Sequence, residues 1–217
     1  MKEFEERKKA KQKEILALKD QLKYYTEPQS FSDAVPIKPQ RAVKEIREFL
    51  EKDAIVWADC GNNLAWVEKY YQALMPKGFM ADGGHTAMGF SVAASIGAKL
   101  GAPNRQVVNL GMIIQGQKFG YGMWEPERYI VTQSYVMDFV KFAEACHAYG
   151  QLVERPTEIK EVLKNAFNSG RPSIIDIRID TNEVPAGALK RFETLVKKHP
   201  ELGEKRIPTT TFPKKAT

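Results

Sequence analysis

The feature that most constrains the fold is an alternation, between residues 40 and 180, of short apolar runs with helical periodicity. Three runs have the length and composition of buried strands: Ala54–Ala58, Gln106–Leu110 and Ser173–Ile179. Between them, apolar residues recur every three or four positions, as on one face of a helix. Strands that alternate with helices form a mostly parallel sheet with helices on both faces. We therefore predict an α/β domain over residues 39–180.

Two extensions flank this domain. Residues 1–38 are expected to form a helix, whose thin apolar stripe includes Ile15 and Leu18, and then a linker interrupted by prolines. Residues 181–217 are mostly polar and contain further prolines, which predicts a C-terminal tail. The chain is therefore expected to hold one domain with its own core.

The distribution of charge and of apolar residues excludes several classes of protein. The net charge of +6 gathers near the two ends, for example in Arg7–Lys9 and Lys214–Lys215, as is usual for solvated helix faces and tails. We therefore expect no nucleic-acid partner. No apolar stretch approaches the roughly 18 residues of a membrane span, and the N-terminus lacks the apolar core of a secretory signal. These features predict a cytoplasmic protein without membrane segments.

Three segments carry more specific information. Val56–Trp66 (VWADCGNNLAW) ends a predicted strand and begins a helix, and Phe79–Phe90 (FMADGGHTAMGF) precedes a helix rich in small residues. The third is Gly111–Gln115 (GMIIQ). A strand that leads into a helix presents backbone N–H groups, here with the amides of Asn62 and Asn63, where a diphosphate binds well. Taken alone, that segment is equally compatible with a simple Asx-rich turn.

In this order and at these separations, the segments resemble the C-terminal domain of the acetolactate synthase superfamily of thiamin-diphosphate (ThDP) enzymes. That superfamily includes glyoxylate carboligase, oxalyl-CoA decarboxylase and 2-hydroxyacyl-CoA lyase. The similarity runs from about Pro39 to Asp180. It implies the ThDP-binding fold in its diphosphate-binding (PP-type) form, with ThDP and Mg²⁺ as cofactors. The middle domain, which holds a flavin in acetolactate synthase, is not matched, so FAD is not expected on this chain.

The resemblance also implies site residues. Met88 matches the bulky residue that bends the cofactor, and Thr86 matches the position whose backbone carbonyl receives the cofactor's amino group. Without the resemblance, Met88 would be interpreted as core filler. His85 either faces the substrate or makes only a local hydrogen bond. The implied cofactor-binding residues are Cys60, Gly61, Asn62, Asn63, Thr86, Met88, Met112 and Ile113, and the implied substrate pocket holds His85, Gln115 and Gly116.

One part of the family pattern is absent. Its metal motif starts with Gly-Asp-Gly after the strand that matches residues 107–110 and ends with Asn-Asn before Gly-Met-Ile, whereas here Leu110 is followed directly by Gly111. About thirty residues are missing, judged from the length of a strand–helix–strand crossover. No metal ligand can therefore be assigned. We expect an omitted segment, with the Cα atoms of Leu110 and Gly111 farther apart in the native protein than the ~3.8 Å of a peptide bond. True adjacency would favour a non-catalytic role.

The resemblance implies a subunit of a ThDP-dependent carbon–carbon lyase, decarboxylase or carboligase that acts on 2-oxo acids or 2-hydroxyacyl-CoA compounds. Gly116 stands where acetolactate synthase has a Trp, which favours a bulkier substrate, such as an acyl-CoA, over acetolactate synthesis. The alternative is a non-catalytic regulatory or assembly subunit that retains the fold.

The pyrimidine-binding domain, whose glutamate activates the cofactor, is expected on a partner in a hetero-oligomer. Because the chain starts at Met1 without a truncated domain, we expect a two-gene enzyme rather than a fragment, inactive without its partner. Residues 40–180 contain no glutamate in a matching motif; Glu45, Glu48 and the others are expected on solvated helix faces. The expected partner surface is the small-residue helix together with the cleft at the strand ends, where we expect an exposed apolar patch in the isolated subunit.

Overall fold

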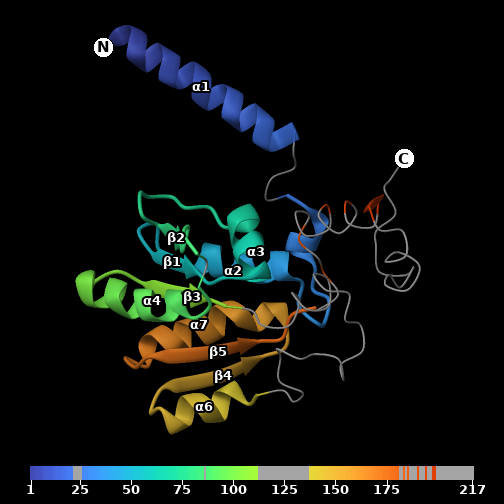
Figure 1. The fold of residues 1–217 in the computed structure, drawn as a ribbon, viewed down its shortest axis with the longest axis vertical. Helices are drawn as coiled ribbons and strands as arrows, with labels where there is room; N and C mark the ends of the chain where they lie inside the picture. Colours follow the sequence, from blue (N-terminus) through green and yellow to red (C-terminus); the bar gives the residue numbers. More distant parts are fainter. Residues whose placement is uncertain are drawn as a thin grey trace.

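The structure is a computed structural model. It describes residues 1–21, 26–85, 87–111 and 137–180, together with positions 183, 185, 190, 194, 197 and 198. Within these residues the strands form two parallel sheets (Figure 1). Strand β1 (Ile55–Ala58) lies between β2 (Phe79–Ala81) and β3 (Val107–Leu110). Strand β4 (Tyr149–Val153) pairs with β5 (Ser173–Ile177). The predicted α/β class with parallel strands is confirmed, although the strands of the described residues form two sheets rather than the one sheet predicted.

The register of the larger sheet aligns the carboxyl ends of its three strands. Ala58, the last residue of β1, is paired with Ala81 at the end of β2 and with Leu110 at the end of β3. The loops that follow these strands therefore leave the sheet at the same edge. In an open α/β sheet this is the edge where ligands bind, because loops and helix N-termini converge there.

Helices cover both sheets (Figure 1). Helix α4 contacts β1 and β3, while α6 and α7 both contact β4 and β5. Helix α1 extends away from the rest of the molecule, and none of its residues is buried. The helices, including the 3₁₀ helices η1 and η3, are α1 Lys2–Gln21, η1 Pro28–Phe31, α2 Pro39–Phe49, α3 Asn62–Tyr70, α4 Phe90–Gly101, α6 Phe139–Ala145, η3 Pro156–Glu158 and α7 Ile159–Asn168.

One hydrophobic core joins the two sheets. Val56 of β1 and Val153 of β4 belong to the same cluster of buried residues, together with Ile46 of α2 and Ile159 of α7. Helices α2 and α7 contact each other, and buried residues of both belong to this core, so they form a layer that links the two halves. No strand of the described residues pairs with both sheets. The connection between the two halves is therefore mainly side-chain packing.

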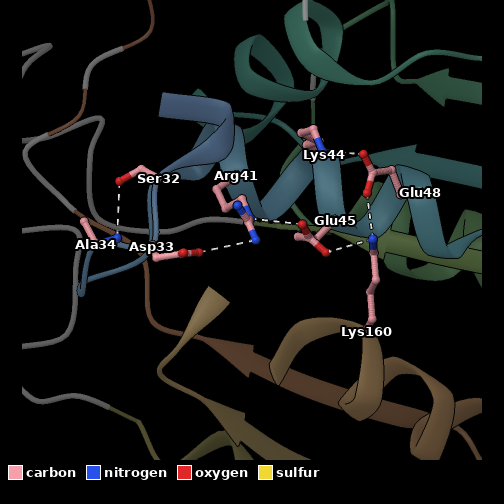
Figure 2. A network of polar contacts seen from close by, with 8 residues as sticks. All are labelled: Ser32, Asp33, Ala34, Arg41, Lys44, Glu45, Glu48 and Lys160. Carbon is pink, nitrogen blue, oxygen red and sulfur yellow. Dashed lines mark hydrogen bonds and ion pairs between the residues drawn. The ribbon is translucent and has the colours of Figure 1, made fainter. Parts of the chain in front are cut away.

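A polar network reinforces the contact between α2 and α7 (Figure 2). Lys160 of α7 forms ion pairs with Glu45 at 3.2 Å and Glu48 at 2.6 Å, both on α2. Arg41 pairs with Glu45 at 3.0 Å and with Asp33 at 3.4 Å. Glu45 is only 6% exposed, so the prediction that it lies on a solvated face is wrong. Two cations from different elements surround its carboxylate and compensate for its burial.

The three predicted strands are present as β1, β3 and β5. The third is shorter than predicted, because Ser173–Ile177 forms the strand and Ile179 makes only an isolated parallel bridge to Ile37. The prolines from Pro28 onward do not exclude helix: η1 starts at Pro28 and α2 at Pro39, each with its proline in the first turn, where no N–H is required. Within the described part of the chain, no helix is long and apolar enough to cross a membrane.

Candidate functional site

The β1–α3 turn forms the first wall of the candidate site. Gly61 is the N-cap of α3 and has φ = +115°, a conformation that residues with a Cβ rarely adopt. No side chain caps this end of the helix. The first N–H groups of an α-helix have no partner within the helix, and the helix dipole adds partial positive charge there. The turn is therefore suited to bind an anion.

The two asparagines after Gly61 have different roles. Asn63 is 3% exposed, and its Nδ2 donates to the carbonyl oxygens of Asp59 at 2.7 Å and Leu110 at 2.8 Å. This amide ties the end of β1 to the end of β3. The Nδ2 of Asn62 is buried and has no acceptor within the described structure. A buried donor without a partner costs about 1–3 kcal/mol, so an external acceptor, such as a diphosphate oxygen, would relieve it.

The β2–α4 loop forms the second wall. The Asp82 carboxylate accepts hydrogen bonds from the backbone N–H of Ala87 at 2.9 Å and of Gly84 at 3.0 Å. These two bonds hold the pKa of Asp82 below its usual value, and the bond from Ala87 has the larger effect. Met88 is 80% exposed and lies outside the core. Gly89, with φ = +86°, is the N-cap of α4. Met88 is therefore presented at the surface immediately before the helix.

One carboxylate connects the two loops. Both oxygens of Asp59 accept from the backbone N–H of Gly89, at 2.9 and 3.1 Å. The Asp59 Oδ1 atom also accepts from the N–H of Cys60 at 2.8 Å. Asp59 lies in a segment that the sequence singled out, but its contact with a residue 30 positions later has no signal in the sequence. It is the principal site residue that sequence reasoning missed.

The predicted cofactor-binding residues Gly61, Asn62, Asn63 and Met88 all lie in the loops or first turn after β1 and β2. Cys60 is half-buried beside them, and His85 is exposed in the second loop. The other predicted site residues lie outside the described residues, and their roles stay predictions: Thr86, Met112, Ile113, Gln115 and Gly116. No group of three His, Cys, Asp or Glu within the described ranges could hold a metal ion. The Mg²⁺ ligands therefore stay unassigned.

Helix α4 has an inverted distribution of polarity. Ser91, near its start, is fully buried, whereas Val92, Ile96 and Leu100 are at least half exposed. These three residues recur every four positions and so lie on one face of the helix. A helix at the surface of a soluble protein normally turns its apolar stripe inward. Helix α4 thus exposes its largest apolar side chains, while its role as a partner surface stays a prediction.

A pocket of about 220 Å³ lies elsewhere, lined by residues of η1, α2 and the end of α3. Two cations line it, and both already have partners: Lys44 pairs with Glu48, and Arg47 donates to the Tyr71 hydroxyl and the Leu50 carbonyl. None of the predicted site residues lines this pocket. The strand-end loops are therefore the better candidate site.

Parallel strands with a turn through Gly61 at a helix N-terminus, next to a glycine-rich loop, define an α/β domain built to bind a phosphorylated cofactor. Residues 59–111 and 109–177 match the family described as thiamine pyrophosphate enzyme, C-terminal TPP binding domain. Thiamine pyrophosphate is another name for ThDP. The chain belongs to this family, as the sequence predicted.

Relatives of this chain include proteins named as acetolactate synthases or probable acetolactate synthases. The chain is 30% identical to a probable acetolactate synthase large subunit of Methanocaldococcus jannaschii, over 84% of this chain and 38% of that protein. It is 30% identical to the corresponding protein of Methanococcus aeolicus, over 77% of this chain and 35% of the relative. The chain is 24% identical to the protein named acetolactate synthase 2, chloroplastic, of Nicotiana tabacum, over 76% of this chain and 31% of that protein. The chain thus spans between 31% and 38% of the length of these relatives.

Two details of these similarities concern the junction of Leu110 and Gly111. The two family matches are separate and overlap only at residues 109–111. The similarity to the M. jannaschii protein extends over 226 residues, more than the 217 of this whole chain, although it includes 84% of the chain. The relative therefore has residues without a counterpart here. Both details are expected if part of the family pattern is absent at this junction. The separation of Leu110 and Gly111 in the native protein stays a prediction.

Proposed function

We propose that this chain is the diphosphate-binding part of a ThDP-dependent carbon–carbon lyase, decarboxylase or carboligase, with Mg²⁺ as the second cofactor and a cytoplasmic location. Membership of the ThDP family supports the cofactor. The observation that carries the proposal is the unpartnered buried Nδ2 of Asn62, at the uncapped N-terminus of α3. A diphosphate supplies the acceptors and the negative charge that this turn lacks. ThDP supplies carbanion stabilisation when it is bound.

The chain's own residues bind and orient the cofactor in this proposal. The N–H groups of the first turn of α3 and the Asn62 amide donate to the diphosphate. Asn63 holds the ends of β1 and β3 in place, because its amide already bonds to both. Met88, exposed before α4, packs against the organic part of the cofactor. The substrate is a 2-oxo acid or a 2-hydroxyacyl-CoA compound; the similarity to acetolactate synthases supports the 2-oxo acid.

A partner subunit with a pyrimidine-binding domain completes the proposed enzyme in a hetero-oligomer. The relatives are almost three times as long as the region matched here, so most of their length has no equivalent in this chain. The outward apolar face of α4 is the proposed contact surface, because burial of Val92, Ile96 and Leu100 would remove a contiguous patch from water. Without the partner's activating carboxylate we expect no turnover, since general acid–base assistance is worth ~10²–10⁴-fold.

The binding role is tested by calorimetric titration of the purified chain with ThDP and Mg²⁺. Asn62→Asp has almost the same shape but replaces the donor with an anionic acceptor. We expect it to weaken binding by at least about tenfold, the effect of losing one hydrogen bond to a charged group. The matched control is Asn165→Asp on the exposed surface of α7. Equal affinities of the two variants would refute the site. Inorganic diphosphate should compete with ThDP if the diphosphate is the part recognised.

The partner surface is tested by Ile96→Lys, with Phe142→Lys as the control at an exposed apolar position on α6. The first variant should abolish association with the pyrimidine-binding subunit and the second should not. Both should leave the isolated chain folded, because both side chains already face solvent. Full turnover by the isolated chain would contradict the two-subunit proposal. A complex that binds ThDP but turns over no substrate would favour a non-catalytic regulatory or assembly subunit.

A further inference from the structure

Asp59 occupies a position whose backbone is fixed on both sides. Its N–H donates to the carbonyl oxygen of Leu110 at 3.0 Å, and its own carbonyl oxygen accepts from Asn63 Nδ2 at 2.7 Å. It follows directly after β1, whose last residue is paired with both neighbouring strands. The carboxylate is therefore presented from a rigid part of the sheet. Such a group can impose a position on a loop that contacts it.

Asp82 holds the loop from within through the N–H groups of Gly84 and Ala87, whereas Asp59 ties it to the end of β1. The single N–H of Gly89 donates to both oxygens of the Asp59 carboxylate. Gly89 is the N-cap residue of α4 and has a left-handed backbone conformation. Gly89 has no side chain with which to cap the helix, so the nearby negative charge of Asp59 takes over part of this task. Met88, the preceding residue, is 80% exposed and is not held by packing. Its position depends on how the backbone at Gly89 is held.

We infer that Asp59 is a positioning residue for the cofactor site: its carboxylate clamps the β2–α4 loop to the end of β1 and so sets where Met88 stands. The inference rests on the proposed function for its consequence, although the clamp itself is independent of any ligand. Asp59 lies two residues before the turn that we propose to bind a diphosphate. A carboxylate there repels an anion. Its benefit to binding is therefore positional rather than electrostatic.

This distinction provides a test in which the two explanations predict opposite changes in the affinity for ThDP. In Asp59→Asn, one acceptor oxygen becomes a donor that faces the Gly89 N–H, while the negative charge is removed. If Asp59 positions the loop, the affinity for ThDP with Mg²⁺ falls roughly tenfold, the scale of one lost hydrogen bond to a charged group. If the carboxylate acts only through its charge, the affinity rises, and the inference is overturned. Asp53→Asn, at the opposite end of β1 and 56% exposed, is the matched control.

Two readouts that need no ligand keep the test independent of the proposed function. Hydrogen exchange of the Gly89 amide, measured by NMR, should be at least about tenfold faster in Asp59→Asn than in the Asp53→Asn control, because two charged acceptor oxygens are reduced to one uncharged oxygen beside a repelling NH₂ group. The ¹³C-methyl resonance of Met88 should shift in the same variant. If the wild-type chain binds no ThDP, the proposed function fails, but these two readouts still show whether Asp59 holds the β2–α4 loop. An unchanged Gly89 exchange rate would overturn the inference even if ThDP binds.

Discussion

Replacement of Lys160 by Met tests how the two halves of the molecule are joined. Lys160 is the residue of α7 that reaches both Glu45 and Glu48 on α2 (Figure 2). Methionine keeps most of the length and apolar surface of the side chain but removes its charge. The substitution therefore isolates the electrostatic contact from packing. Since α2 and α7 form the layer that links the two halves, the effect of the substitution measures how much this contact contributes to the free energy of unfolding.

The expected magnitude follows from the burial of the partners. Breaking a fully buried ion pair costs ~3–5 kcal/mol, because an uncompensated charge is left inside, whereas exposed pairs contribute ~0–1 kcal/mol. The side chain of Glu45 is 8% exposed but that of Lys160 is 45% exposed, and Glu45 retains Arg41 as a partner. These facts place the variant between the two limits. We expect it to lower the free energy of unfolding by about 1–2 kcal/mol at neutral pH.

The pH dependence adds an independent check. Hydrogen bonds from Lys160 first and Lys44 second hold the pKa of Glu48 below its ordinary 4.5. A lowered pKa in the folded state contributes stability that is present above the unfolded value and lost as the pH falls through the folded one. The bond with Glu48 conversely raises the pKa of Lys160 above 10.5, so its contribution is lost only as the pH rises beyond that value. The variant should therefore be less sensitive to acid below pH 4.5 than the wild type.

The assay is urea unfolding followed by circular dichroism at neutral and acid pH, with and without added salt. Lys164→Met is the control, because Lys164 lies one turn further along α7 and is exposed, without an ion pair in the described structure. It should change stability by no more than about 0.5 kcal/mol. Equal losses in the two variants would refute the role of the network. So would an unchanged acid sensitivity in Lys160→Met.

Two further predictions concern glycine packing and a buried phenol. In Gly150→Ala, the new Cβ would lie 2.9 Å from both the Val140 carbonyl oxygen and the Ala143 Cβ, so α6 must move away from β4 at a cost of ~1–3 kcal/mol. In Gly97→Ala, the new Cβ would have nothing within 4 Å, so this variant should stabilise α4 by ~0.5–1 kcal/mol. Urea unfolding compares the free energies of unfolding of the two variants, and a loss of stability in both would contradict the packing argument. Burial, and then Glu27, raise the pKa of Tyr70 well above 10.0. Its contribution to stability is thus present below that pH and is lost as the pH rises above it. In an alkaline titration followed by tyrosinate absorbance, Tyr70 should ionise only when the chain unfolds, with Tyr70→Phe as the reference. Ionisation of Tyr70 near pH 10 while the circular dichroism stays native would contradict the prediction.

The strands that the sequence predicted are those whose apolar run is long enough to be recognised, such as Ala54–Ala58, which contains β1. Phe79–Ala81 is too short to show a period, although it forms β2. In β4 (YGQLV), Gly150 and Gln151 interrupt the apolar run. Gly150 is present because α6 approaches the strand closely, and such a tertiary demand leaves no periodic signal in the sequence.

The candidate site shows the same division between local and long-range information. Gly61 and Asn62 could be found because a strand, a turn and a helix N-terminus follow each other in the chain. The clamp between Asp59 and Gly89 could not, since it joins residues of two separate loops. Glu45 has the spacing of a solvated residue on its own helix. It is buried because Lys160, 115 positions later, meets it from α7.

The arrangement of the two sheets separates the stability of the chain from the geometry of its site. Gly61 and Asn62 follow β1, and their frame consists of bonds between the ends of β1 and β3, through Asn63 and Leu110. All of these bonds lie within the larger sheet. The second sheet reaches this half through the shared core and the α2–α7 layer. Loosening that layer should therefore lower the free energy of unfolding without displacing the site. Under conditions where Lys160→Met remains folded, it should bind ThDP as the wild type does, whereas Asp59→Asn should impair binding without a comparable loss of stability.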